Sequence, residues 1–414
     1  SAATWTESAE LARSLQGAGF SGMLYTETTQ VPWMQIAAAS MAAPDLFFTT
    51  GIAVAFPRSP MVSAAVAYEL AANTGGRFRL GLGSQVKAHV TRRYGAEFER
   101  PAARMRDYVL AVRACFRAFN QEERLSYDGE FWQLSLLPRD WSPRRHDHPM
   151  YVDMSAVGPV MTRVAGEVAD GIHVHPLHSM SYIEQRLLPA VAEGASAAGR
   201  DAGDVDLIIP VFACPGDTPE ERAAYVATAK RQIAFYGSTP NYAFQFDDLG
   251  FEGTTERIRS KMKAGELDTI GDVITDEMFE HFALTATWDE MADRLLDRYD
   301  GTAQRVVMYL GEREMRTDPE QLSKWGEVAA ATSRVRRDAL SREPVVVRVP
   351  VSNTGDRPVT VVVQGYVAPV DPPADRPHRE LVCWVKMQLD AGEERTAELR
   401  FDELSFRRWD TATD

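Results

Sequence analysis

Short β-rich or apolar runs alternate with longer stretches of helical period along most of the chain, which predicts βα units around a parallel sheet. The predicted strands are Ala2–Trp5, Gly22–Thr26, Phe47–Ala53, Arg77–Gly83, Met150–Asp153, Gly171–Val174, Leu207–Ala213 and Arg305–Tyr309. The predicted helices are Ser8–Ala18, Pro60–Asn73, Ala102–Phe119, Gly158–Ala169, Tyr182–Ala198, Pro219–Phe235 and Trp288–Arg298. This number of strands favours an α/β fold of the (β/α)8 TIM-barrel type, and a doubly wound open sheet is the structural alternative.

Three stretches depart from this repeat. Residues 121–149 are polar and interrupted by prolines, and residues 237–280 are rich in Gly, Asp and Lys. Insertions of this length in a barrel are usually lids or binding loops. After about Leu340 the pattern becomes β-rich, with turn-forming residues at 353–356. We therefore predict a barrel domain over residues 1–340 and a small all-β sandwich over residues 341–414.

Composition narrows the possible functions. The chain has 414 residues, more than the ~250 to 300 at which single cores usually stop growing, so two domains are expected. A formal net charge of -14 argues against a nucleic-acid or anionic-membrane surface, because both need concentrated Lys and Arg. The three cysteines are far apart and form no CxxC pair, which fits a reduced cytoplasm. No apolar run approaches the ~18 residues of a membrane span, and the start shows no signal-peptide pattern.

Glycine and polar residues follow several predicted strands, at the end where parallel α/β folds bind ligands. Gly83 permits close approach of a ligand to the backbone, and the Ser84 hydroxyl with nearby amides could hold a phosphate. Val157 and Gly158 precede a first-turn proline, so the free amides of a helix start could face an anion. A glycine that merely ends a strand and an ordinary helix start are the plain alternatives.

Four sequence blocks, in the same order along the chain, resemble the bacterial-luciferase-like flavin and deazaflavin oxidoreductases, most closely the branch that uses coenzyme F-420. The blocks are residues 51–60, 75–89, 157–171 and 231–238. This resemblance extends from Ser1 to about Leu310. It implies a non-proline cis peptide between Gly51 and Ile52, behind the cofactor ring. It also implies phosphate and ring contacts at Gly83, Ser84, Val157 and Gly158.

The same resemblance suggests where catalysis takes place. Glu27 falls where relatives carry an acid or polar group near the deazaflavin, and a solvated acid is the alternative. His89 follows the fourth strand and could perform acid–base work near neutral pH, orient the cofactor or simply pack. Thr28 and Val86 fall where sugar-oxidising relatives carry a catalytic histidine and glutamate. These two departures argue against a sugar-phosphate dehydrogenase reaction.

Substrate-pocket candidates are the aromatic residues near strand ends together with one histidine. They are Trp33, Phe56, His175, Phe235 and Tyr236. Aromatic residues in such positions are more often core than substrate contacts. The spacing of His173, His175 and His178 also fits a zinc site, but a barrel metallohydrolase needs further ligands at other strand ends, so no metal is expected.

The tail resembles the fibronectin-type-III-like domain at the C-terminus of family 3 glycoside hydrolases. The matching residues are 351–358, 366–369, 379–381 and 401–410. Taken together, these patterns favour a cytoplasmic oxidoreductase that moves a hydride between coenzyme F-420 and a small organic substrate, and the family resemblance suggests a homodimer. The alternatives are an FMN-dependent luciferase-like monooxygenase, a metal-dependent barrel hydrolase, and a catalytically lapsed barrel that serves as a binding or scaffold protein.

Overall fold

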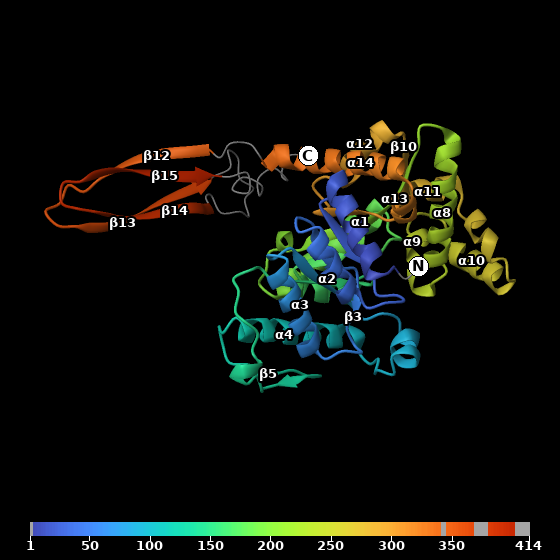
Figure 1. Ribbon diagram of the computed structural model, residues 1–414, viewed down its shortest axis with the longest axis horizontal. Helices are drawn as coiled ribbons and strands as arrows, with labels where there is room; N and C mark the ends of the chain where they lie inside the picture. Colours follow the sequence, from blue (N-terminus) through green and yellow to red (C-terminus); the bar gives the residue numbers. More distant parts are fainter. Residues whose placement is uncertain (1–2, 341–344, 368–379, 402–414) are drawn as a thin grey trace. The chain divides into compact units, whose positions relative to one another are not determined.

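The structure is a computed structural model that describes residues 3–340, 345–367 and 380–401 (Figure 1). The chain divides into two compact units, residues 1–332 and 333–414. The predicted domain boundary between residues 340 and 341 stays a prediction. Among the described residues, no helix is long and apolar enough to cross a membrane.

The first unit is built on a parallel sheet of nine strands in the part of the chain that the structure describes. The strands are β1 (Gly22–Tyr25), β2 (Phe47–Thr50), β3 (Ala53–Val54), β4 (Phe78–Gly83), β7 (Tyr151–Ser155), β8 (Gly171–His173), β9 (Asp206–Pro215), β10 (Ala283–Ala286) and β11 (Arg305–Met308). Their hydrogen-bonded order is β1-β2-β4-β7-β8-β9-β10, with β3 beside β4 and β11 beside β9. The guanidinium of Arg305 in β11 lies 4.5 Å from the Phe47 ring in β2, so the last strand approaches the first strands. This is the predicted α/β architecture of the TIM-barrel type.

Helices follow most strands. They are α1 (Trp5–Ala18), α2 (Pro32–Ala42), α3 (Pro60–Asn73), α4 (Pro101–Phe119), α5 (Pro159–Val168), α6 (Met180–Tyr182), α7 (Leu188–Ala197), α8 (Pro219–Gly237), α12 (Trp288–Tyr299), α13 (Glu312–Thr317) and α14 (Pro319–Leu340). The first insertion carries β5 (Tyr127–Asp128) and β6 (Gln133–Leu134). The second carries α9 (Phe244–Asp247), α10 (Thr254–Lys263) and α11 (Asp276–Phe282), and Figure 1 shows α10 and α11 grouped with α8.

Six of the predicted strands are confirmed with small shifts at their ends, Phe47–Ala53 is divided into β2 and β3, and one is wrong. The predicted strand Ala2–Trp5 is replaced by the start of α1 at Trp5, while Ala2 lies outside the described residues. The cause is a capping box, in which the Thr4 side chain accepts from the Glu7 amide and the Glu7 carboxylate accepts from the Thr4 amide. Strand β10 was not predicted.

Alternate residues of β4 point into the barrel. Arg79 pairs there with Asp153 at 2.7 Å and with Asp206 at 2.8 Å. Two residues further on, a Cβ added to Gly81 would lie 2.5 Å from His173 Nε2 and would overlap the Thr50 carbonyl oxygen. Ion pairs and packed side chains therefore fill the barrel interior at the level of Arg79 and Gly81. The carboxyl ends of the strands remain as the place for a ligand.

The second unit contains two antiparallel strand pairs. Strand β12 (Val345–Ser352) pairs with β15 (Glu394–Phe401), and β13 (Val359–Val367) pairs with β14 (Glu380–Leu389). β14 also packs against β15. These small sheets fit the predicted fibronectin-type-III-like domain, of whose matching residues 368, 369, 379 and 402–410 lie outside the described part of the chain.

Candidate active site

The carboxyl ends of β3, β4 and β7 meet around Gly83, the last residue of β4. A Cβ added to Gly83 would lie 2.6 Å from Ser155 Oγ and 2.7 Å from Ile52 Cγ1. Gly83 is thus the residue that leaves room between these two side chains. Ser155 was missed in the sequence, because the strand predicted there ended at Asp153, two residues too early.

The peptide bond between Gly51 and Ile52 is cis, as expected from the family resemblance, and it separates β2 from β3. A Cβ on Gly51 would overlap the Leu24 side chain, so only glycine fits the first position of this bulge. The second position places Ile52 beside Gly83. The two residues predicted as ring contacts are therefore neighbours at the strand ends.

Glu27 is buried and stands behind this bulge. Its backbone amide donates to the Ile52 carbonyl at 3.2 Å, and its Oε2 accepts from the Val54 amide at 2.8 Å. Arg58 donates to both carboxylate oxygens, to Oε1 at 2.6 Å and to Oε2 at 2.8 Å. Both oxygens are engaged by donors of the chain itself, which suits a group that positions the bulge. The catalytic role of Glu27 stays a prediction.

The polar groups predicted to hold a phosphate are the Ser84 hydroxyl and the backbone amides at the start of α5. The half-buried Ser84 hydroxyl donates to the Gln85 carbonyl at 3.2 Å. Gly158 occupies the N-cap of α5 without a side-chain cap, and a Cβ placed there would meet nothing within 4 Å. No side chain therefore caps the first-turn amides of α5, which is the arrangement an anion could use. The carbonyl of Val157 accepts a hydrogen bond from the Tyr182 hydroxyl at 2.8 Å.

His89 is the first residue of a one-turn π-helix, His89–Arg93, and its side chain is exposed. The guanidinium of Arg93 donates to the Thr28 carbonyl, which holds this turn beside the end of β1. His89 is therefore near the Glu27 end of the site and accessible to solvent. Its part in catalysis stays a prediction.

A second group of side chains gathers where β8 and β11 end. The His175 ring lies 4.8 Å from the Tyr236 ring and 4.6 Å from the Tyr242 ring, and the hydroxyls of Tyr236 and Tyr309 hydrogen-bond each other. Burial lowers the pKa of His175 to about 4, and its Nδ1 accepts from the Leu177 amide at 3.1 Å. The neutral ring therefore carries its proton on Nε2. Tyr242 and Tyr309 were not predicted, since loop tyrosines give no periodic signal.

The other residues predicted to line a substrate pocket are Trp33, Phe56 and Phe235, and their surroundings differ. Trp33 is buried in α2 with the Arg58 guanidinium 5.8 Å from its ring, next to the Glu27 ion pair. Phe56 is buried and packs edge to face on Phe98 at 5.9 Å. Phe235 is 55% exposed. The structure thus joins His175 with Tyr236 and places Trp33 with the bulge, whereas Phe56 is part of the core.

The three histidines near β8 each have protein partners. His173 Nε2 lies 3.5 Å from Thr49 Oγ1, and His178 contacts the His175 carbonyl and the Tyr299 hydroxyl at 2.9 and 3.2 Å. Within the described ranges, no group of three or more His, Cys, Asp or Glu residues could hold a metal ion.

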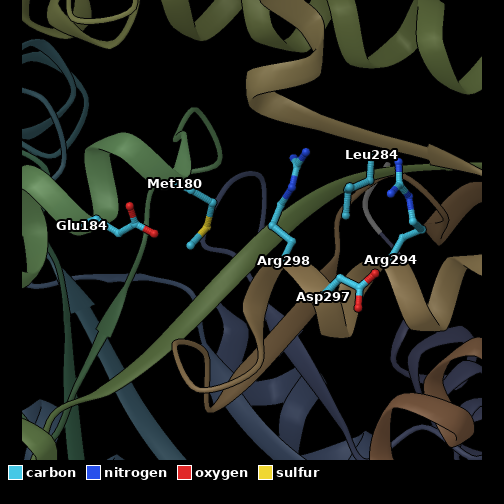
Figure 2. A pocket seen from close by; sticks show the side chains of 6 residues that line it. All are labelled: Met180, Glu184, Leu284, Arg294, Asp297 and Arg298. Atoms are coloured by element: carbon cyan, nitrogen blue, oxygen red, sulfur yellow. The ribbon is translucent and has the colours of Figure 1, made fainter. Parts of the chain in front are cut away.

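An open cleft of about 350 Å³ lies elsewhere, between the α6 region and the α12 helix (Figure 2). Figure 2 shows Met180 and Glu184 on one side and Arg294, Asp297 and Arg298 on the other. Arg298 donates to the carbonyls of Ala283 and Glu280 at 3.0 and 3.1 Å. Acidic and basic groups balance here, and none of the predicted site residues lines the cleft.

Comparison with known proteins agrees with this geometry. A model of the luciferase-like monooxygenase family matches residues 1–305. The chain belongs to the luciferase-like monooxygenase family. The members of this family found by comparison include oxidoreductases and monooxygenases. A second model, of the fibronectin type III-like domain, matches residues 361–414.

Two relatives within the luciferase-like family illustrate its range. An uncharacterized protein of Mycobacterium tuberculosis (strain ATCC 25618 / H37Rv) is 34% identical over 300 residues, which are 72% of this chain and 88% of that protein. A 5,10-methylenetetrahydromethanopterin reductase of Methanolobus tindarius is 25% identical over 260 residues, 62% of this chain and 75% of that enzyme.

Solved structures support the luciferase-like fold. A coenzyme F-420-dependent tetrahydromethanopterin reductase from Methanopyrus kandleri matches with a TM-score of 0.62 and 18% identity over 78% of this chain and 94% of its own. An FMN complex of a Baeyer–Villiger monooxygenase component from Pseudomonas putida matches with a TM-score of 0.52 and 13% identity over 80% and 91%. At these identities the matches establish the fold alone.

Proposed function

We propose that this protein is a deazaflavin-dependent oxidoreductase, which transfers a hydride between coenzyme F-420 and a small organic substrate. The observation that carries the proposal is the close packing at Gly83, where Ile52 and Ser155 lie against a backbone without a side chain and three parallel strands end. A strand end without a side chain lets a flat ring approach the backbone closely. Similarity to F-420-dependent enzymes supports this cofactor, and the match to an FMN complex makes FMN the alternative.

The residues around this strand end fit such a cofactor. Ile52 offers an apolar surface to one face of a planar ring, and the Glu27–Arg58 ion pair holds the segment that carries it. The uncapped amides at the start of α5, after Gly158, would hold a phosphate. When bound, the deazaflavin supplies the carbon that accepts or donates the hydride. The protein's own task is to bind, to orient one face of the ring and to exclude water.

The acid–base group needs a side-chain nitrogen or oxygen that is not already hydrogen-bonded within the protein. His89 is exposed beside the end of β1, whereas both oxygens of Glu27 already accept hydrogen bonds from the chain. We assign His89 as the candidate acid–base group and Glu27 as a positioning group. Thr28 and Val86 replace the acid–base residues of the sugar-oxidising relatives, so a phosphorylated sugar is disfavoured as substrate.

Titration of the purified full chain with coenzyme F-420 and with FMN tests the proposal. F-420 should bind with a change in deazaflavin fluorescence, and at least about tenfold more tightly than FMN. Tighter binding of FMN would assign the protein to the flavin-dependent monooxygenases instead. Binding of F-420 without turnover on a panel of alcohols, ketones and imines would favour a lapsed, ligand-binding barrel.

A further inference from the structure

A buried carboxamide in the second insertion has no partner in the described part of the protein. Gln245 is 2% exposed, and neither its Oε1 nor its Nε2 makes a hydrogen bond within the described residues. Leaving such a group unsatisfied costs about 1 to 3 kcal/mol per polar atom. Buried amides of this kind normally have their hydrogen bonds completed by an ordered water or by a ligand.

The position of Gln245 points to the aromatic group at the ends of β8 and β11. Residues 240–247 form two consecutive helical pieces, η5 (Pro240–Tyr242) and α9, joined by Ala243 in helical conformation. Residues three apart on a helix share a face, so Gln245 lies on the face of Tyr242, whose ring contacts His175. Phe244 packs on Tyr182 at 5.7 Å, and the Tyr182 hydroxyl is bonded to the Val157 carbonyl. The segment is therefore anchored beside the start of α5.

The polar groups whose rings contact His175 are uncharged. Arg186 lies 5.0 Å from the Phe244 ring, and its guanidinium is already paired with Asp248. The Tyr236 and Tyr309 hydroxyls are joined by one hydrogen bond, in which only one hydroxyl proton is used. Burial raises the pKa of Tyr309, so its hydroxyl stays protonated at neutral pH. Nε2 of the neutral His175 makes no hydrogen bond within the described residues and is available as a donor. Together these groups offer donors and acceptors without a formal charge.

We propose that Gln245, His175 and the Tyr236–Tyr309 hydroxyl pair form the part of the site that recognises an uncharged substrate, through hydrogen bonds to its carbonyl or hydroxyl groups. This inference rests on the proposed function, since it assigns the substrate side of the same strand-end site. A phosphate or carboxylate would find no cation among these four residues, and its desolvation would go uncompensated. Small ketones and secondary alcohols fit this chemistry.

Binding of three ring compounds to the full chain tests the inference. Dissociation constants for cyclohexanone, cyclohexanol and cyclohexanecarboxylate are measured by saturation-transfer NMR, which needs no turnover. The two uncharged compounds should bind at least about tenfold more tightly than the carboxylate. Gln245→Leu and Tyr309→Phe should each weaken cyclohexanol binding about five- to tenfold, as expected for one lost hydrogen bond. Equal binding of the carboxylate would overturn the inference.

The controls separate recognition from folding. Gln245→Leu removes an unsatisfied buried amide, so its melting temperature should equal or exceed that of the wild type while cyclohexanol binding falls. Tyr225→Phe is the matched control, because the Tyr225 hydroxyl also hydrogen-bonds, to Gln321 and Trp325, outside the site. Its cyclohexanol affinity should be unchanged. Wild-type affinity in both site variants would overturn the inference.

A separate titration with coenzyme F-420 distinguishes the two proposals. Absence of F-420 binding, together with the predicted cyclohexanol pattern, would refute the proposed function and leave the recognition site standing. F-420 binding without discrimination among the ring compounds would refute the recognition site alone. If Gln245→Leu weakens F-420 binding and leaves cyclohexanol binding intact, Gln245 belongs to the cofactor site and the inference fails.

Discussion

Arg58 holds both carboxylate oxygens of Glu27, at 2.6 and 2.8 Å, in a pair whose side chains are 17% and 3% exposed. Arg58 also donates to the Val54 carbonyl at 2.7 Å, while Glu27 accepts from the Val54 amide. The Arg58 guanidinium and the Glu27 carboxylate thus both hold Val54 of β3, the strand that follows Ile52. This pair connects the end of β1 to the segment that borders the proposed ring site.

Replacing Arg58 by Gln should destabilise the protein strongly. The change leaves the Glu27 carboxylate buried without its cation, which typically costs about 3 to 5 kcal/mol. Arg58→Lys keeps the charge and loses the two-pronged contact, so an intermediate loss is expected. Urea denaturation measures the free energy of unfolding. Arg117→Gln, which breaks the exposed Arg117–Glu123 pair, is the control and should cost less than about 1 kcal/mol. Equal losses in the two glutamine variants would contradict a stabilising ion pair at Glu27.

Gly83→Ala should weaken cofactor binding. The new methyl group would sit within 2.7 Å of both Ser155 Oγ and Ile52 Cγ1, so at least one of these side chains must move. We expect a loss of about 1 to 3 kcal/mol in stability and at least about tenfold in F-420 affinity, measured by urea denaturation and fluorescence titration. Gly17→Ala adds the same methyl group in α1 with no atom within 4 Å. It should stabilise the chain by up to about 1 kcal/mol and leave the F-420 affinity unchanged. Unaltered affinity in Gly83→Ala would show that no ring approaches the backbone at Gly83.

Local signals explain why much of the fold could be predicted. The helix Pro60–Asn73 has the predicted bounds, because Ser59 caps it by accepting from the Val62 amide and a first-turn proline follows. The strand predicted at the start failed for a related reason. The predicted strand Ala2–Trp5 runs into α1, where the Thr4–Glu7 capping signature was decisive. Strand β10 reads Ala-Leu-Thr-Ala, with a single β-branched residue and no aromatic one, so its composition did not indicate a strand.

The candidate site was predictable only where a glycine or the family pattern marked it. Gly83 and the Gly51–Ile52 bulge were found in this way. The partner of Glu27 was not, because Arg58 lies 31 residues further along the chain and meets it only when β1 and β3 are adjacent. Gln245 was missed for the same reason, since an unsatisfied amide is a property of packing and leaves no mark in the sequence.

Stability should fall as the pH drops from about 6.5 toward 4. Burial lowers the pKa of His178 to about 4, while in the unfolded chain it is about 6.5. Between these values the unfolded state binds the proton and the folded state does not, so the stabilisation present above pH 6.5 is lost as the pH falls through the folded pKa. His178→Gln should be less stable at pH 7 and show a shallower decline over this window in urea denaturation. The exposed His148→Gln should keep the wild-type slope. A wild-type slope in His178→Gln would contradict a depressed pKa at this residue.

Asn353→Ala should unfold the β-rich unit at lower temperature and leave the barrel transition in place. Asn353 is buried, and its Nδ2 donates to the carbonyls of Arg357 at 2.7 Å and Asp390 at 2.9 Å, while its Oδ1 accepts from the Gly355 amide at 3.0 Å. It therefore ties the turn after β12 to the turn before β15. Its loss removes these three hydrogen bonds from the two turns, at a cost of about 1 to 3 kcal/mol.

Differential scanning calorimetry of the full chain should resolve this effect. Residues 1–332 and 333–414 form separate compact units, so we expect two transitions, of which Asn353→Ala lowers only one. Gln388→Ala, an exposed change in β14, is the control and should alter the same transition by less than about 0.5 kcal/mol. A single transition, lowered as a whole by Asn353→Ala, would show that the two units unfold cooperatively, and the β-rich unit would then contribute directly to the stability of the barrel.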